Sequence, residues 1–211
     1  MFCDLAGSTA LASRLDPEEM GEVLKAFQNA VTGEIARLEG HVAKLMGDGI
    51  LAYFGWPRAH EDEAERAVRS GLAIIAAVAR LRTPMGVPLA CRVGIATGLV
   101  VIGDLIGEGS AQEEAVVGDT PNLAARLQGL AEPGKVIVSD TTRRLLGGVF
   151  ELTELAPQSV KGFAAPIPAY LVEGETARGP FRCLSCSVGA VGRPCAGTGI
   201  ASWPLATGPD R

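Results

Sequence analysis

The sequence Lys44-Leu45-Met46-Gly47-Asp48-Gly49-Ile50 lies between two apolar, strand-like runs, residues 41–46 and 50–54. An acid flanked by two glycines between such runs is typical of a β-hairpin turn. Glycine accepts the positive φ of a tight turn and leaves the backbone open to a ligand. The sequence therefore predicts a hairpin with Asp48 at its tip and Lys44 on the upstream arm. An ordinary turn also accounts for the motif taken alone, since Asp favours turns through its own hydrogen bonds.

The chain begins with another acid in apolar surroundings. Residues 1–5 are apolar except for Asp4 and predict a buried strand, in which a carboxylate is costly to bury unless it is paired. Because a strand usually has five or six residues, we expect the natural sequence to begin further upstream. Residues 6–9, Ala-Gly-Ser-Thr, predict a loop whose backbone N–H groups would suit phosphates, although they also describe a plain helix start.

Two long amphipathic helices are predicted from apolar residues at helical spacing. The first begins at Asp16-Pro17-Glu18-Glu19, where an Asp cap precedes a proline in the first turn, and it ends at Gly40. The second covers residues 61–82 and is followed by Pro84. Both are expected to pack on a sheet and to carry no chemistry.

A third helix is predicted over residues 119–131, capped by Asp119 or Thr120. Its Asn122 and Arg126 are one helical turn apart, on a different face from the leucines of its core stripe. A solvated arginine with a helix-start asparagine fits this pattern. A polar pair aimed at one ligand is the alternative.

The remaining elements are strands and one short helix. Residues 89–97 and 98–103 predict a second hairpin, with Arg92 pointing to solvent or to a partner. Further strands are expected at 136–138, 149–152 and 167–172, and a short helix is expected over 140–146. This order predicts an α+β domain with helices packed on one mainly antiparallel sheet.

Composition excludes several classes of protein. The chain has 211 residues, a formal net charge of -5, 5% aromatic residues and no basic run, which argues against a nucleic-acid groove. No apolar stretch is long enough to span a bilayer, and the start lacks the pattern of a signal peptide. We therefore expect a cytoplasmic protein without a membrane segment, in which Cys3 and Cys91 are small buried residues.

The composition shifts from about residue 175. Residues 179–211 contain Gly and Pro throughout, a single acid and no Lys, and they show no periodicity. We expect residues 175–211 to form a disordered tail. An alternative is a zinc-binding interaction module built on Cys183, Cys186 and Cys195, although a single Cys-x-x-Cys pair is weak evidence for zinc.

Four motifs together resemble the catalytic domain of class III nucleotidyl cyclases, over residues 1–174. The matching stretches are Phe2 to Thr9, Lys44 to Gly49, Val117 to Leu127 and Ser159 to Phe163, in the family's order. The resemblance implies the ferredoxin-like nucleotidyl cyclase fold. It also implies an adenylate cyclase that converts ATP into 3′,5′-cyclic AMP and pyrophosphate in intracellular signal transduction. Its active sites would lie between the subunits of a head-to-tail homodimer.

The resemblance also implies the role of each site residue. Asp4 and Asp48 would hold two Mg²⁺ ions, for which Mn²⁺ can substitute, and these are ions that prefer oxygen ligands. Arg126 would stabilise charge on the α-phosphate, and Asn122 would orient the ribose. The substrate-binding residues would be Lys44 for the base, Lys161 for the terminal phosphates, and Gly7, Ser8 and Thr9 for the triphosphate.

Base selectivity follows from two positions. Lys at position 44 marks adenine recognition in this family, whereas guanylate cyclases carry Glu there. The second base-reading position aligns with Ala115, which has neither donor nor acceptor in its side chain. A guanylate cyclase is therefore one alternative. A non-catalytic regulatory or nucleotide-binding domain of the same fold is another.

Overall fold

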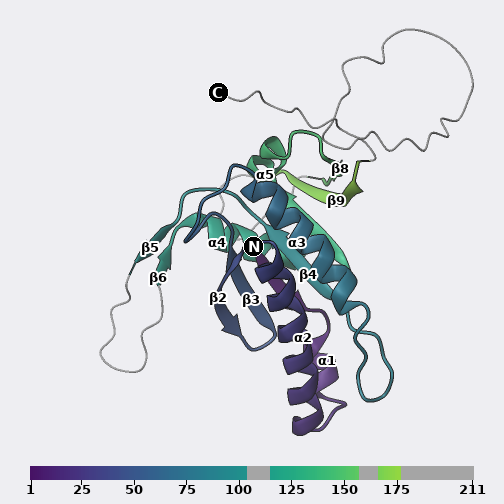
Figure 1. Ribbon diagram of the computed structural model, residues 1–211. Helices are drawn as coiled ribbons and strands as arrows, with labels where there is room; N and C mark the ends of the chain where they lie inside the picture. Colours follow the sequence, from purple (N-terminus) through teal and green to yellow (C-terminus); the bar gives the residue numbers. More distant parts are fainter. Residues whose placement is uncertain (104–114, 157–165, 177–211) are drawn as a thin grey trace, which may run out of the picture. The chain divides into compact units, whose positions relative to one another are not determined.

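One seven-stranded sheet forms the centre of the fold, in the order β2-β3-β1-β4-β7-β9-β8 (Figure 1). The computed structural model describes residues 1–103, 115–156 and 166–176, all within the unit Met1–Pro180. Neighbouring strands are antiparallel except β4 and β7, which are parallel. The predicted α+β class is confirmed. The strands of this sheet are β1 (Phe2–Leu5), β2 (His41–Met46), β3 (Gly49–Tyr53), β4 (Cys91–Ile95), β7 (Lys135–Ser139), β8 (Phe150–Glu154) and β9 (Ala169–Glu175).

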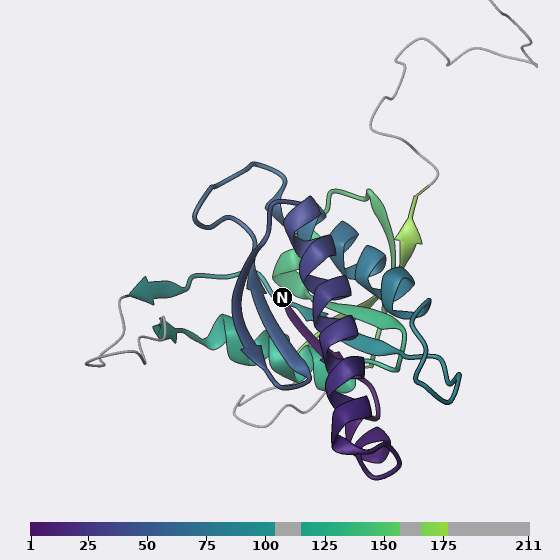
Figure 2. The same ribbon diagram turned by 60° about the horizontal axis from the view of Figure 1, so that its bottom comes forward.

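Helices cover both faces of this sheet (Figure 2). Because strand side chains alternate between faces, Cys3 and Val93 point into a core shared with α2 and α3. Asp4 and Gly94 point to the opposite face, where α4 packs. The helices are α1 (Ser8–Ala12), α2 (Pro17–Arg37), α3 (Glu63–Val78), α4 (Asp119–Leu130) and α5 (Asp140–Leu145).

The start of α2 has the cap that its sequence predicts. The Asp16 side chain accepts a hydrogen bond from the Glu19 amide at 2.8 Å, and the Glu19 side chain accepts one from the Asp16 amide at 3.2 Å. Pro17 is the first helical residue, where its missing N–H costs nothing. This reciprocal cap stabilises the helix end by about 1 kcal/mol.

The predicted second hairpin is wrong. Strand β4 pairs with β1 on one side and with β7 on the other, so neither of its edges is left for residues 98–103. Instead, β5 (Val101–Gly103) pairs antiparallel with β6 (Ala115–Val117) in a separate two-stranded sheet. Local apolar patterning indicated the strands correctly, but their partners are set by residues far away in the sequence.

Two helix boundaries also differ from expectation. Gly118, and neither Asp119 nor Thr120, precedes the first turn of α4, and no side chain caps it. The Thr120 hydroxyl instead donates to the Leu99 carbonyl oxygen at 3.2 Å. Helix α3 ends at Val78 rather than near position 82, because the chain turns back there and Arg82 forms a bridge with Pro88.

Three smaller expectations concern cysteines, membranes and the tail. Cys3 and Cys91 are buried, as predicted, and both are free thiols. No helix in the described ranges is long and apolar enough to cross a membrane. The expected disordered tail, with Cys183, Cys186 and Cys195, lies outside the described residues.

Candidate functional site

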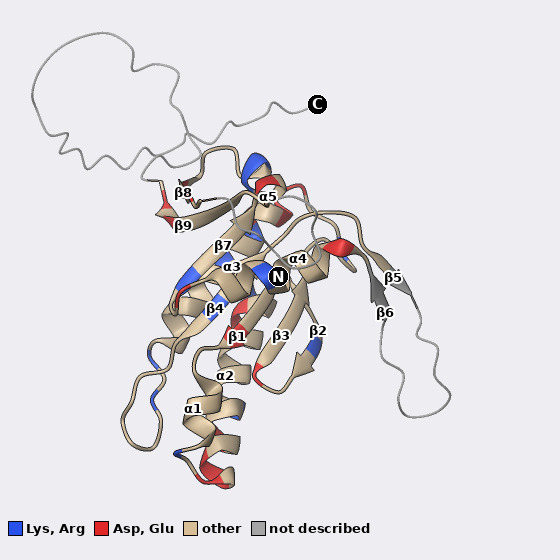
Figure 3. Cartoon of the chain, turned by 180° about the vertical axis from the view of Figure 1, so that it is seen from behind, with Lys and Arg blue, Asp and Glu red and all other residues tan. Residues whose placement is uncertain are grey.

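The fold brings Asp4 and the Asp48 turn together. Asp4 lies opposite Gly49 in the register of β1 and β3, and the Leu5 amide donates to the Asp48 carbonyl oxygen at 3.2 Å. Figure 3 shows the acidic positions of β1 and of the β2–β3 turn on neighbouring segments. The predicted hairpin is confirmed, and its tip lies beside the end of the first strand.

Helix α2 fixes this turn from outside the hairpin. Gly47 has a positive φ of 67°, which glycine adopts without strain. The Gln28 side-chain amide donates to the Gly47 carbonyl oxygen at 2.9 Å. Sequence reasoning assigned no chemistry to this helix and missed Gln28, because nothing in a helical pattern shows which residue of a distant turn it will meet.

The electrostatics of Asp4 reflect a crowded and partly buried position. Burial raises the pKa of the Asp4 carboxyl above its ordinary value, and the nearby Asp48 carboxylate raises it further. The Arg92 guanidinium and hydrogen bonds from Gln128 and the Leu5 amide act in the opposite direction. The first two effects prevail, so the carboxylate of Asp4 is less stable here than that of an exposed aspartate.

The position of Arg92 differs from the prediction that it points to solvent or to a partner. It lies directly opposite Asp4 in the register of β1 and β4, on an inner strand, and it is only partly exposed. Its Nε atom is buried and has no hydrogen-bond partner among the described residues. The prediction was wrong because it treated residues 89–97 as the arm of a hairpin. Arg92 is thus a site residue that the sequence pattern did not reveal.

Helix α4 has an exposed polar side and a buried side that contacts Asp4. Asn122 and Arg126 are exposed, and neither has a hydrogen bond or ion pair within the described ranges. Gln128 follows Arg126 by two residues, which is about 200° around a helix. Gln128 is accordingly buried, and its amide donates to the Asp4 Oδ2 atom at 3.4 Å. The helix therefore contacts Asp4 with one side and presents its polar pair on the other.

Gly94 allows α4 to approach the sheet this closely. A Cβ atom at Gly94 would overlap the Ala124 carbonyl oxygen and the Gln128 backbone nitrogen. The backbone of α4 therefore rests directly on β4 at Gly94, where any larger residue would push the helix away from the sheet.

Replacing Gly94 by alanine should displace α4 and lower the free energy of unfolding by about 1–3 kcal/mol, as for other overpacked sites. Urea denaturation measures this loss. Gly129→Ala on α4 is the matched glycine-to-alanine control, because the new Cβ would meet open space and helix propensity favours alanine. A Gly94→Ala protein as stable as wild type would mean that α4 does not pack this closely.

The remaining predicted residues lie near the acids or on the edge of the sheet. Lys44 pairs with Leu51, which pairs with Phe2, so Lys44 lies on the sheet face that carries Asp4. Its side chain is exposed on the edge strand β2. Gly7, Ser8 and Thr9 form the start of α1, just after the end of β1, and Gly7 has a φ of 73°. Lys161 lies outside the described residues.

The oxygen ligands in this region suit a hard divalent cation. No group of three or more His, Cys, Asp or Glu side chains suited to a metal occurs in the described part of the chain. Mg²⁺ does not need one, because it is commonly held by one or two carboxylates together with water and substrate phosphates. A cation beside Asp4 and Asp48 would also relieve the repulsion that raises the pKa of Asp4. The residues present therefore fit the ion.

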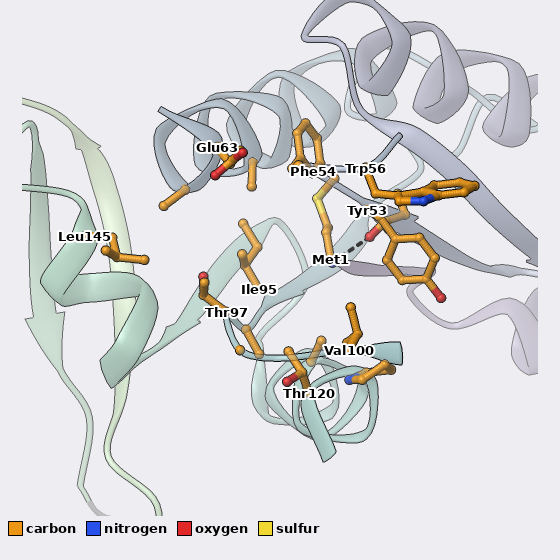
Figure 4. A pocket seen from close by; sticks show the side chains of 18 of the residues that line it. Met1, Tyr53, Phe54, Trp56, Glu63, Ile95, Thr97, Val100, Thr120 and Leu145 are labelled. Carbon is orange, nitrogen blue, oxygen red and sulfur yellow. Dashed lines mark hydrogen bonds between the residues drawn. The ribbon is translucent and has the colours of Figure 1, made fainter. Parts of the chain in front are cut away.

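A separate pocket lies at the other end of β1 (Figure 4). It is enclosed by the ends of β3 and β4 and the starts of α3 and α4, and its lining includes Met1, Tyr53, Trp56 and Thr120. The Met1 amine donates to the Ala52 carbonyl oxygen at 2.8 Å, and burial lowers the pKa of this amine to about 5. Of the predicted site residues that the structure describes, none lines this pocket.

Comparisons with known proteins identify the family of this chain. Residues 1–174 match the family described as the adenylate and guanylate cyclase catalytic domain. The chain is 38% identical over 164 residues to an uncharacterised protein, R02095, of Rhizobium meliloti, covering 77% of the chain and 16% of that protein. It is 29% identical over 180 residues to an adenylate cyclase of Mycobacterium tuberculosis, covering 85% of the chain and 40% of that protein.

The fold is shared with solved cyclase domains. The guanylate cyclase domain of RhGC from Catenaria anguillulae, solved in complex with GTP, matches with a TM-score of 0.77 at 27% identity. This match covers 83% of the chain and 94% of that domain. The chain spans less than half of the length of the two curated relatives, whereas it spans nearly all of the solved domain. The chain thus belongs to the class III adenylate and guanylate cyclase catalytic domains.

Proposed function

We propose that this domain is an adenylate cyclase, which converts ATP into 3′,5′-cyclic AMP and pyrophosphate in a homodimer with two equivalent sites at its interface. One observation carries the proposal. Asp4 and Asp48 lie together beside Arg92, whereas Asn122 and Arg126 stand exposed on α4, without partners in the described part of their own chain. Each chain would therefore hold two complementary half-sites, and a second copy would complete both.

The residues of the chain would divide the work of binding and charge stabilisation. Asp4 and Asp48 would hold Mg²⁺ or Mn²⁺, which when bound lowers the pKa of the ATP 3′-hydroxyl and neutralises charge on the phosphates. Arg92 partly offsets the charge of Asp4 before any ion arrives, and its guanidinium is of the kind that binds phosphate oxygens.

The partner subunit would supply the residues that act on the α-phosphate and the sugar. The guanidinium of Arg126 would donate to the oxygens of the α-phosphate as their charge grows in the transition state. The Asn122 amide would orient the ribose. The triphosphate would be bound by the backbone of Gly7, Ser8 and Thr9 and by the Lys161 ammonium. These are the remaining substrate-binding residues that the resemblance implies.

Lys44 supports adenine as the base. An ammonium group only donates hydrogen bonds. N1 of adenine is an acceptor, whereas N1 of guanine carries a proton, so lysine matches adenine and a glutamate would match guanine. The similar proteins do not decide this point, because one is named an adenylate cyclase and another was solved with GTP.

The deciding experiment supplies the purified protein with ATP or GTP, together with Mg²⁺ or Mn²⁺, and measures both cyclic products. We expect cyclic AMP to predominate. Lys44→Glu should lower kcat/KM for ATP by about 10- to 100-fold, the value of one charged hydrogen bond. Lys25→Glu is the control, because Lys25 is an exposed lysine on α2 and its replacement changes the net charge equally.

Two outcomes would contradict the proposal in different ways. Cyclic GMP in excess of cyclic AMP would overturn the adenine assignment and favour the guanylate cyclase alternative. A protein that binds Mn²⁺ and nucleotide but forms neither product would favour the non-catalytic domain instead.

A further inference from the structure

Gln128 connects the acid of one half-site to the helix that carries the other. It is 8% exposed, and its side-chain amide donates to Asp4 Oδ2 at 3.4 Å across 124 residues of sequence. Among the described hydrogen bonds, this is the one that a side chain makes to the Asp4 carboxylate. A buried polar side chain at this position has a cost that its hydrogen bond offsets.

The geometry of α4 makes this contact a property of a single chain. The missing side chain at Gly94 lets the helix backbone rest on β4, and this brings Gln128 over the neighbouring strand β1. Asn122 and Arg126 lie on the opposite, exposed side of the same helix. The inward side of α4 thus faces Asp4 of its own chain, and the outward side is open to a second copy.

We propose that Gln128 is a positioning residue for the metal-binding acid of its own chain, so that one helix serves both active sites of the dimer. Gln128 acts on Asp4 within its chain, while Asn122 and Arg126 act in the site completed by the partner subunit. The role of Asn122 and Arg126 in the partner's site rests on the proposed function. The contact between Gln128 and Asp4 does not depend on it.

The amide restricts the carboxylate in a way that favours a cation. A carboxylate that accepts one fixed donor loses part of its rotational freedom, and its remaining lone pairs stay available as ligands. Arg92, opposite Asp4 on the neighbouring strand β4, attracts the carboxylate as a whole. Without Gln128, Arg92 would compete with the cation for an acid that is free to turn.

Replacing Gln128 by methionine tests the first half, because methionine preserves the volume and removes the donor. Mn²⁺ binding without nucleotide, followed by the electron paramagnetic resonance signal of the free ion, should weaken about tenfold, as for other residues that support metal ligands. Gln128→Asn retains an amide but is too short to reach Asp4, and it should weaken binding similarly. Gly129→Ala, one position further on α4, should bind Mn²⁺ like wild type.

A thermal melt of the metal-free protein accompanies each titration. An unchanged Mn²⁺ affinity in folded Gln128→Met and Gln128→Asn proteins would overturn the positioning role. A loss of affinity in the Gly129→Ala control would also overturn it, because the effect would then belong to the helix rather than to the amide.

The second half needs a dimer with a single working site. Asp48→Ala and Arg126→Ala chains, mixed, form a dimer whose one intact site takes its acids from the Arg126→Ala chain. Adding Gln128→Met to that chain should raise the Mn²⁺ concentration for half-maximal activity about tenfold. The same change in the Asp48→Ala chain should leave that concentration unchanged.

The reverse pattern would overturn the assignment of Gln128 to its own chain. Absence of any activity in the mixture would overturn the dimer itself, whereas the Mn²⁺ titration decides the Gln128–Asp4 contact independently.

Discussion

An Asp4→Asn or Asp48→Asn protein should form cyclic nucleotide about a thousandfold more slowly than wild type, or slower, while keeping its fold. Each carboxylate is a proposed ligand for a cation that must neutralise several phosphate charges, and an amide oxygen is a poorer ligand for Mg²⁺. Initial rates with ATP and Mg²⁺ measure the loss. Near wild-type activity in either variant would defeat the assignment of these acids as metal ligands.

The same substitution at Asp4 should make the metal-free protein more stable. Burial and Asp48 raise the pKa of the Asp4 carboxyl, so the folded state binds its proton more tightly than the unfolded state does. The stabilising effect of that proton is fully present below the unfolded value, about pH 4, and it is lost as the pH rises through the raised folded value. At neutral pH the ionised group therefore destabilises the fold, and asparagine removes this cost.

Thermal melts in a chelating buffer test this sign. Asp4→Asn should melt at a higher temperature than wild type at neutral pH, and the difference should shrink toward pH 4. Asp62→Asn is a control that should lower the melting temperature at neutral pH, because the hydrogen bond with Arg66 lowers the pKa of the Asp62 carboxyl. Added Mn²⁺ should raise the melting temperature of wild type but not of Asp4→Asn. A lower melting temperature for Asp4→Asn would mean that Asp4 stabilises the fold.

Local signals in the sequence predict the parts of the site that lie within one turn of chain. The Gly47-Asp48-Gly49 turn and the Asp16–Glu19 cap both depend on residues three or fewer positions apart, and both are found as expected. Their geometry follows from backbone preferences that a short peptide already has. The acid at the hairpin tip could therefore be placed from sequence.

Contacts between distant segments could not be read from such signals. Arg92 joins the site because β4 is an inner strand, which is decided by its pairing with β1 and β7. Gln28 reaches the Gly47 carbonyl oxygen of the turn across 19 residues, and Gln128 reaches Asp4 across 124 residues. Both glutamines lie on helices whose apolar pattern is unremarkable at these positions. A buried glutamine on an amphipathic helix is the one signal that reasoning from sequence alone would have had for Gln128.

Mixing inactive Asp48→Ala and Arg126→Ala proteins should restore about a quarter of wild-type activity, if each site uses acids from one chain and α4 from the other. Each homodimer lacks one half of both of its sites. A mixed dimer contains one site with both defects and one site with neither. With free exchange about half of the dimers are mixed, and each of these has one intact site of two.

The size of the single defects makes this recovery measurable. Arg126→Ala alone should reduce activity by about a hundredfold or more, as for other donors that stabilise charge in a transition state. The Asp48→Ala protein should be weaker still, so neither parent approaches a quarter of wild-type activity. Arg126 is exposed and has no partner in the described part of its chain, so its loss should not unfold the protein that is being mixed. Subunit exchange, followed with differently tagged chains, is the necessary control. Exchange without recovery of activity would mean that each site is built within one chain, and the exposed face of α4 would then need another explanation.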